Sequence, residues 1–180
     1  QDGNFSWEAL AEKCNADLSN DFGNLVNRSI SMTRKYFSNE TLLAPSRLNH
    51  SEEVKSSFEA LLPELEESVH QMNPSGYAQA CFSRSRVLNL FIDQMKPWKM
   101  AKEKEQVDQL REVLYTLLEG IYWLGVVFRP LLPKGMSQVF GQLGVEVPKN
   151  QEAFRQLRWG ERGFQPQPPT PIYPRIEIPE

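Results

Sequence analysis

The stretch from about residue 104 to residue 129 constrains the fold of this chain more than any other. Its first half is amphipathic, because apolar side chains recur at helical spacing among charged ones. Its second half, residues 121–128, is apolar nearly all round, so no side of that helix suits water. Such a helix belongs at the centre of a bundle, enclosed by other helices. Pro130 and Pro133 follow it and end it.

The same periodicity in four other stretches predicts the helices that enclose it. The chain therefore reads as all-α, a bundle of about five helices followed by an extended, proline-rich C-terminal tail. The expected helices span residues 6–37, 52–72, 77–95, 104–129 and 134–143. We expect the bundle to occupy residues 5–157 and the tail residues 158–180, together forming a single domain over residues 1–180.

Local signals set the ends of these helices. Ser6 or Asn4 is the expected N-cap of the first helix and Ser51 that of the second, because their side chains can accept from free backbone N–H groups. Pro63 should kink or divide the second helix. Gly144 is a typical stop for the last helix. Residues 38–50 and 73–76 read as a loop and a turn, and residues 151–157 as a brief last turn.

Composition excludes several classes of protein. Lys and Arg number 20 against 23 Asp and Glu, a net charge of -3, so a nucleic-acid site would have to be a local basic patch. The two cysteines, Cys14 and Cys81, have no CxxC spacing, which favours free thiols in a reducing compartment over a disulfide framework or a zinc site. Neither histidine has clustered metal ligands near it, and we expect no metal site.

Targeting segments are not evident in the sequence. The chain opens without Met and without a charged-then-apolar leader, which we interpret as the start of a piece excised from a longer protein. The longest apolar stretch, residues 117–128, contains Glu119 and is shorter than the roughly 20 residues that span a bilayer.

No catalytic motif is present. The sequence contains no GxSxG, no HExxH and no glycine-rich phosphate loop. Cys14 and Cys81 fall on apolar helix faces, where structural cysteines are the rule. We expect a helical binding or structural module without a catalytic site of its own.

One heptad, residues 96–102, combines an aromatic ring with positive charge. Pro97 disfavours helical geometry at Lys96, so the chain must turn there. Trp98 is flanked by Lys96, Lys99 and Lys102, an arrangement suited to stacking on a base beside a phosphate backbone. The alternative is that Trp98 fills a gap between helices while the lysines are solvated.

A second polar pair lies in the first helix. Asn24 and Arg28 are four residues apart, so they project from one face and could grip a base edge. They could equally be ordinary surface residues. The preceding Gly23 costs about 1 kcal/mol in a helix, and close approach of another helix would explain it.

Three segments, in this order, resemble one family. Residues 21–28 (DFGNLVNR) resemble the D-L-G-N-L-x-x-R helix that opens the anticodon-binding domain of class I aminoacyl-tRNA synthetases. Residues 91–102 (FIDQMKPWKMAK) resemble a segment of methionyl-tRNA synthetases. Residues 130–144, followed by YPRIE at 173–177, resemble the C-terminal helix and closing F-P-R-I-E tail of the same family, with Tyr173 where Phe is usual.

This resemblance implies a function and a set of site residues. Trp98 would stack on the first anticodon base beside Pro97, and Asn24 and Arg28 would contact the same region. Lys96 and Lys99 would supply positive charge next to the indole. The partners implied are methionine tRNA, through its CAU anticodon, and the catalytic domain of the same enzyme, with neither DNA nor a membrane.

The parent implied is an ATP-dependent methionine–tRNA ligase of the cytoplasm or an organellar matrix. The family's HIGH-like and KMSKS motifs and its zinc-binding insertion are absent from these residues. This segment should therefore need no cofactor, because ATP, methionine and any zinc would belong to the missing catalytic part. Two other interpretations remain open at this point: a helical protein-interaction module anchored by Trp98, and the anticodon domain of another class I synthetase.

Overall fold

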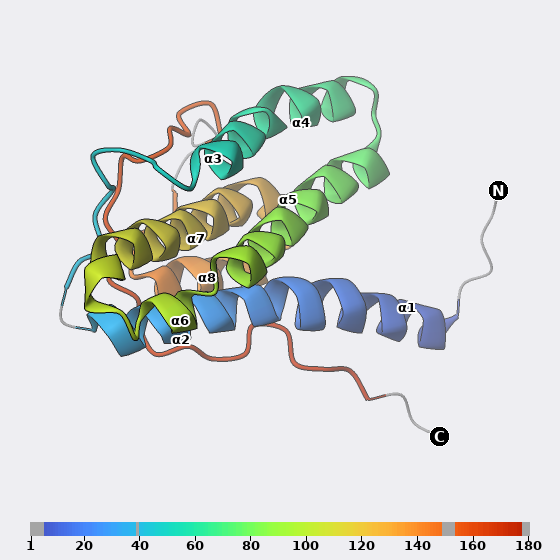
Figure 1. Cartoon of the computed structure of the whole chain (residues 1–180). Coiled ribbons are helices and arrows are strands. Elements are labelled where there is room, and N and C mark those ends of the chain that lie inside the picture. The colour runs from blue at the N-terminus through green and yellow to red at the C-terminus, as the bar shows by residue number, and fades with distance from the viewer. Residues whose placement is uncertain (1–5, 39, 149–153, 178–180) are drawn as a thin grey trace.

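The computed structural model describes residues 6–38, 40–148 and 154–177, and these residues form a bundle of helices (Figure 1). Two long rods are each built from elements joined end to end: α1, η1 and α2 make the first, and α3 and α4 make the second. With each rod counted as one helix, the predicted all-α bundle of about five helices is confirmed. The elements are α1 (Trp7–Cys14), the π-helical η1 (Asn15–Gly23), α2 (Asn24–Phe37), α3 (Glu52–Glu59), α4 (Leu61–His70), α5 (Pro74–Met95), α6 (Pro97–Met100), the 3₁₀ turn η2 (Lys104–Gln106), α7 (Val107–Phe128) and α8 (Pro133–Leu143).

Helix α7 lies at the centre, as its apolar second half predicts. It packs against α2, α3, α5, α6 and α8, and nearly all of its residues are buried. Glu119 is fully buried within it and is paired with Arg162 from the segment after α8. Tyr115 and Trp123 donate to the same carboxylate, each at 3.1 Å. This network fastens the C-terminal segment onto the central helix.

The first rod differs from expectation in the middle. Ser6 caps α1 as predicted, accepting from the N–H of Ala9 at 3.0 Å, whereas Asn4 lies outside the described residues. The nine residues of η1, however, have π-helical geometry. A Cβ on Gly23 would lie 2.8 Å from the carbonyl oxygen of Leu18, five residues back. The wider turn of the rod itself, and not another helix, therefore explains this glycine.

Prolines define the next two boundaries. The second rod is divided at Ala60, three residues before Pro63, which fits the predicted break. Ser51 precedes α3 as expected, but its side chain makes no capping hydrogen bond. Helix α5 begins at Pro74, not at residue 77, because Asn73 accepts from the N–H of Gly76 at 2.8 Å and caps it. The predicted 73–76 turn was therefore wrong: proline is well suited to the first helical position.

The C-terminal segment wraps back over the bundle (Figure 1). Gly144 ends α8 with a φ of 71°, as predicted, and the segment over residues 158–177 has no helix or strand. Phe164 is fully buried and forms an isolated antiparallel bridge with Leu42. Farther on, the side chain of Asn15 binds the backbone of Ile176 through two hydrogen bonds. The brief turn expected over 151–157 lies partly outside the described residues.

Candidate RNA-binding site

The end of α5 is set by a left-handed residue. Lys96 has a φ of 50° and donates its backbone N–H to the carbonyl of Ile92 at 2.9 Å, which closes the helix. Pro97 then begins the one-turn helix α6. The turn predicted from the Lys-Pro pair is confirmed, because proline keeps the preceding residue out of right-handed helical geometry.

This turn leaves the Trp98 indole at the surface. Pro97 and Met100 are buried on either side of it, and α6 packs on α7, so the short helix is anchored through those two residues. Trp98 itself is 38% exposed. Stacking on a base requires an exposed ring of this kind, and the alternative that Trp98 fills a gap between helices is not supported.

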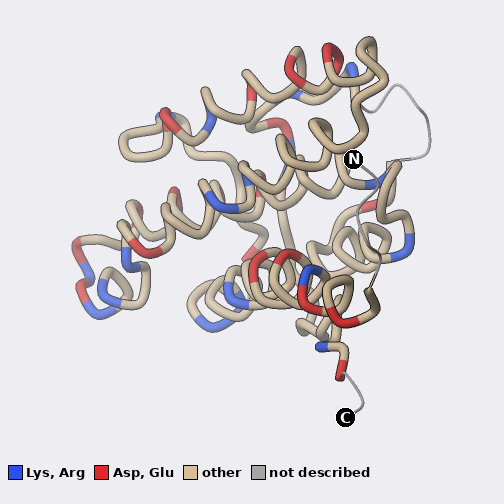
Figure 2. Tube along the Cα trace, turned by 90° about the vertical axis from the view of Figure 1, so that its right-hand side faces the viewer, with Lys and Arg blue, Asp and Glu red and all other residues tan. Residues whose placement is uncertain are grey.

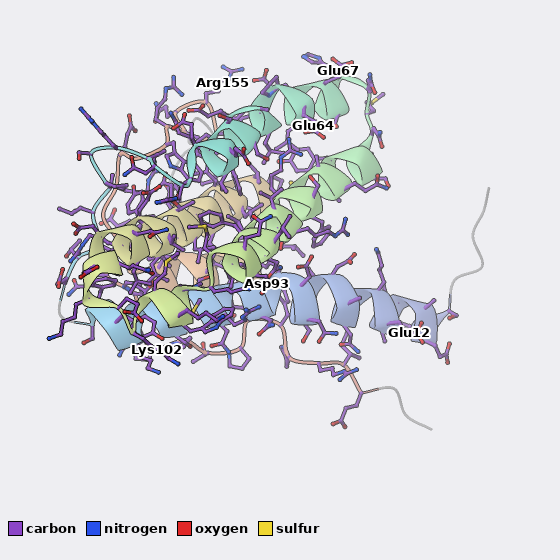
Figure 3. All side chains as sticks on the ribbon, in the orientation of Figure 1. Glu12, Glu64, Glu67, Asp93, Lys102 and Arg155 are labelled. Carbon is purple, nitrogen blue, oxygen red and sulfur yellow. The ribbon has the colours of Figure 1, made fainter. Side chains whose placement is uncertain are left out.

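Three lysines lie close to Trp98 in the chain. Lys96, Lys99 and Lys102 are all exposed, and Figure 3 labels Lys102 close to the end of α6. Glu103 and Glu105 follow directly, and Figure 2 shows basic and acidic residues interspersed along the rest of the trace. A local cluster of lysines on a molecule of net negative charge can attract a phosphate backbone.

Arg28 reaches this region through an ion pair. Its Nη2 lies 3.4 Å from Oδ1 of Asp93, five residues before Trp98 on α5. Figure 3 shows Asp93 where α5 ends above the long rod. Both side chains are open to solvent, so the pair contributes little to stability. Its consequence is positional: the guanidinium is held toward the end of α5 that carries the lysines.

Asn24 is exposed and lies in different surroundings. It lines a hollow of about 430 Å³ between the long rod and residues 171–175 of the C-terminal segment. Neither Arg28 nor Trp98 lines this hollow. The structure therefore brings Arg28 to the end of α5, whereas contact of Asn24 with the same anticodon region as Trp98 stays a prediction.

Asp21, the first residue of the DFGNLVNR motif, has a structural role. Its carboxylate accepts from the side-chain amide of Asn89 and lies 3.9 Å from Arg86, which ties η1 to α5. Burial raises the pKa of Asp21, and Arg86 and the Asn89 hydrogen bond oppose that effect. The carboxylate thus helps to hold the rod bearing Asn24 and Arg28 against α5.

Sequence reasoning missed two members of this neighbourhood. Asp93 was not singled out, although its place one helical turn before the Lys-Pro pair marked it as an acid beside cations. Residues 171–175 were taken only as part of a tail, and no local pattern reveals which helix they cover. Among the described residues there is no cluster of three or more metal-ligating side chains, and no helix suited to crossing a membrane.

Comparison with known proteins first defines a class. The family model described as tRNA synthetases class I (M) matches residues 1–30. The chain is 30% identical over 181 residues to methionine–tRNA ligase from Fusobacterium nucleatum, and 31% identical over 180 residues to methionine–tRNA ligase 1 from Bacillus cereus. Each match covers 98% of this chain but only 28% and 27% of the relatives, so the chain spans little more than a quarter of their length.

Solved structures agree on the fold. Apo methionyl-tRNA synthetase from Mycobacterium tuberculosis superposes with a TM-score of 0.85 and 24% identity, over 99% of this chain and 36% of that one. The same enzyme in complex with methionyl-adenylate gives a TM-score of 0.81 over 95% of this chain and 34% of that one. The chain is therefore similar to the class I tRNA synthetases. Over nearly all of its length, the chain is similar to one segment of methionine–tRNA ligases, and its fold is that of one segment of a methionyl-tRNA synthetase.

Proposed function

We propose that this chain is the anticodon-binding domain of a methionyl-tRNA synthetase and that it recognises the CAU anticodon of methionine tRNA. The observation that carries the proposal is the exposed indole of Trp98. Two buried neighbours in the chain fix its position, and exposed lysines flank it in the sequence. An unpaired anticodon base offers a flat face for such a ring, while its backbone phosphates meet the ammonium groups.

The remaining predicted residues fit the same chemistry. Pro97 sets the orientation of Trp98, and Lys96 and Lys99 lie at the surface on either side of it. Arg28 and Asn24 offer a guanidinium and an amide, which can bind the edges of unstacked bases. Arg28 already lies beside the end of α5, and Asn24 would be reached by the bases farther along the loop.

The rest of the enzyme supplies the chemistry in this proposal. Methionine activation with ATP would take place in a catalytic domain, along with any bound zinc. This segment would hold the anticodon so that the acceptor end of the tRNA reaches that domain. The proposal places the enzyme where translation takes place, in the cytoplasm or an organellar matrix.

The test is binding of RNA stem-loops to the 180-residue chain. Trp98→Ala should weaken binding of a CAU stem-loop by about 1–3 kcal/mol, the value of one stacked base. The loss should be much smaller for a stem-loop with an unrelated anticodon. Trp7→Ala is the matched control, because Trp7 is 73% exposed at the far end of the long rod, and it should leave CAU binding unchanged.

Three outcomes would count against the proposal. Equal affinity of the unmutated chain for CAU and unrelated loops would exclude anticodon recognition. Equal affinity after a change of the first anticodon base would indicate a synthetase for another amino acid. Absence of RNA binding would favour a protein-interaction module in which Trp98 anchors a partner.

A further inference from the structure

A second surface feature lies at the start of the long rod, on helix α1. Its apolar residues Trp7, Leu10 and Cys14 recur at helical spacing, so they form a stripe along one face. Trp7 is 73% exposed and Leu10 42%, and Cys14 is half-buried. Glu8 and Glu12 lie outside this stripe and are exposed as well. An amphipathic helix of this kind normally packs its apolar face against another body.

The described bundle leaves most of this helix open. Figure 1 shows α1 extending past the ends of the neighbouring helices, and its contacts with described helices are chiefly those with η1, its own continuation. Ala11 is the one α1 residue that the described structure buries. An isolated helix of this length is marginal in water, so α1 depends on the rod or on further contacts. Large apolar side chains gathered on one exposed face mark an interaction surface.

The rod connects this stripe firmly to the proposed RNA site. Asp21 of η1 accepts a hydrogen bond from the side chain of Asn89 on α5, and the side chain of Asn15 holds the C-terminal segment. These contacts fasten the rod directly after α1. Arg28 follows Trp7 by 21 residues on the same rod, which corresponds to about 30 Å along a helix. The stripe is therefore remote from the RNA site, and the rod that joins the two is held in place.

The comparisons with known proteins indicate what covers this face. The match to the model for tRNA synthetases class I (M) spans residues 1–30, which takes in α1, η1 and the first half of α2 but none of the later helices. This chain covers 28% of the matched ligase from Fusobacterium nucleatum, and its fold covers 36% of the Mycobacterium tuberculosis chain. In those proteins the fold is joined to a much larger remainder. Because α1 is the helix whose whole sequence fits the synthetase model, the remainder of such an enzyme is favoured as the occupant of its open face.

We propose that the stripe of Trp7, Leu10 and Cys14 packs against an apolar surface of the catalytic part of the same synthetase. The proposal rests on the proposed function, because it needs this chain to be the anticodon-binding domain of that enzyme. Burial of the indole and of the leucine side chain holds the two parts together, while the glutamates of α1 stay in water. The rod then fixes the distance between the anticodon site and the reacting end of the bound tRNA.

The experiment compares the 180-residue chain with the intact synthetase in which the proposed function places it. Cys14 lies on the stripe, whereas Cys81 is fully buried in the bundle and serves as an internal reference. Both proteins are treated with iodoacetamide, and the alkylation of each cysteine is followed by mass spectrometry of its peptide. Cys14 should react in the 180-residue chain and about tenfold more slowly, or less, in the intact synthetase. Cys81 should stay unreactive in both.

Two matched substitutions locate the contact. Leu10→Glu places a charge in the stripe at an exposed position, so the 180-residue chain should keep its melting temperature and its affinity for the CAU stem-loop. In the intact synthetase, the same change should restore the reactivity of Cys14 and lower kcat/KM for aminoacylation of the tRNA about fivefold or more, because the two parts are no longer held in register. Leu131→Glu is the control: Leu131 is 41% exposed, nearly as much as Leu10, and lies in the α7–α8 connection. This change should leave every readout as in the unmutated proteins.

Other results would overturn the proposal. Equal alkylation of Cys14 in the 180-residue chain and in the intact synthetase, or identical effects of Leu10→Glu and Leu131→Glu, would exclude this face as the contact. Protection of Cys14 that grows with the concentration of the 180-residue chain, and is lost in Leu10→Glu, would identify a second copy as the occupant. The proposed function fails separately, since equal affinity of the unmutated chain for CAU and unrelated stem-loops would exclude anticodon recognition whatever the reactivity of Cys14.

Discussion

Tyr173 places a phenol hydroxyl in a buried position without a hydrogen-bond partner among the described residues. The ring packs close to Gly135 at the start of α8, where a Cβ would lie 1.9 Å from the hydroxyl oxygen. Gly135 therefore provides the space that this residue needs. A buried hydroxyl that exchanges water for no partner costs free energy.

Tyr173→Phe should stabilise the chain at neutral pH by about 1 kcal/mol, because it removes that uncompensated group while it keeps the ring. Urea denaturation at pH 8 measures the change in the free energy of unfolding. A loss of stability in the variant would show that the hydroxyl has a partner after all.

The same substitution should change the alkaline limb of the stability curve. Burial raises the pKa of Tyr173 from 10.0 to about 12, so the unfolded chain releases this proton at lower pH than the folded chain. The unmutated chain should therefore lose stability as the pH rises from 10 to 12. Tyr173→Phe should make that fall shallower without abolishing it, because burial also raises the pKa of Tyr77 and Tyr115. Identical slopes for the two proteins would contradict the assignment.

For single residues, the sequence predicts those features that the steric restrictions of the residue itself decide. The Lys96–Pro97 pair implies a turn whatever the surroundings, and the turn brings Trp98 to the surface. The ion pair between Arg28 and Asp93 joins residues 65 positions apart, so only the packing of two helices reveals it. The same holds for Asn24, whose neighbours come from the far end of the chain.

Among the elements, the long rod depends on an interaction with the C-terminal segment. Asn15 begins the π-helical stretch, and its side-chain amide both donates to the carbonyl of Ile176 at 2.9 Å and accepts from its N–H at 2.8 Å. This pair of bonds holds the segment along η1 and completes the hollow that Asn24 lines.

Asn15→Ala should release the end of the segment while the bundle stays folded. Loss of the two bonds should cost about 1–2 kcal/mol locally, so the Ile176 amide should exchange with deuterium about 5–30 times faster. Native-state hydrogen exchange measured by NMR reports this rate for the single amide.

Asn20→Ala serves as its control, because Asn20 is exposed on η1 beside the same segment and has no hydrogen bond to it among the described residues. Its Ile176 amide should exchange as in the unmutated chain. Equal acceleration in both variants would mean that the π-helical stretch, and not the Asn15 amide, retains the segment.

The sequence predicts a helix boundary correctly where a single residue restricts the backbone. The break near Pro63 and the stop at Gly144 were predicted because each residue restricts its own backbone. The start of α5 and the π-helical geometry of η1 were not. In both, a residue usually counted as a helix breaker, Pro74 or Gly23, fits the helix because of a cap or a wider turn.

Across the whole molecule, charge is unevenly distributed on a body of net charge -3. The lysines of residues 96–104 cluster where α5 gives way to α7, and the glutamates of α3 and α4 lie along another edge (Figure 2). An RNA loop is therefore attracted at one place and repelled at the other. This separation follows from how the helices are arranged, and composition alone conceals it.

The salt dependence of RNA binding tests this arrangement. Affinity for the CAU stem-loop should fall linearly with the logarithm of salt concentration, and each lost phosphate contact should reduce the slope by about 0.7. Lys99→Gln should produce that reduction, because Lys99 is exposed one residue after Trp98. Lys134→Gln removes the same charge at the start of α8, near the opposite end of α7, and should leave the slope unchanged. An equal reduction in both variants would mean that net charge, and not the patch around Trp98, governs binding.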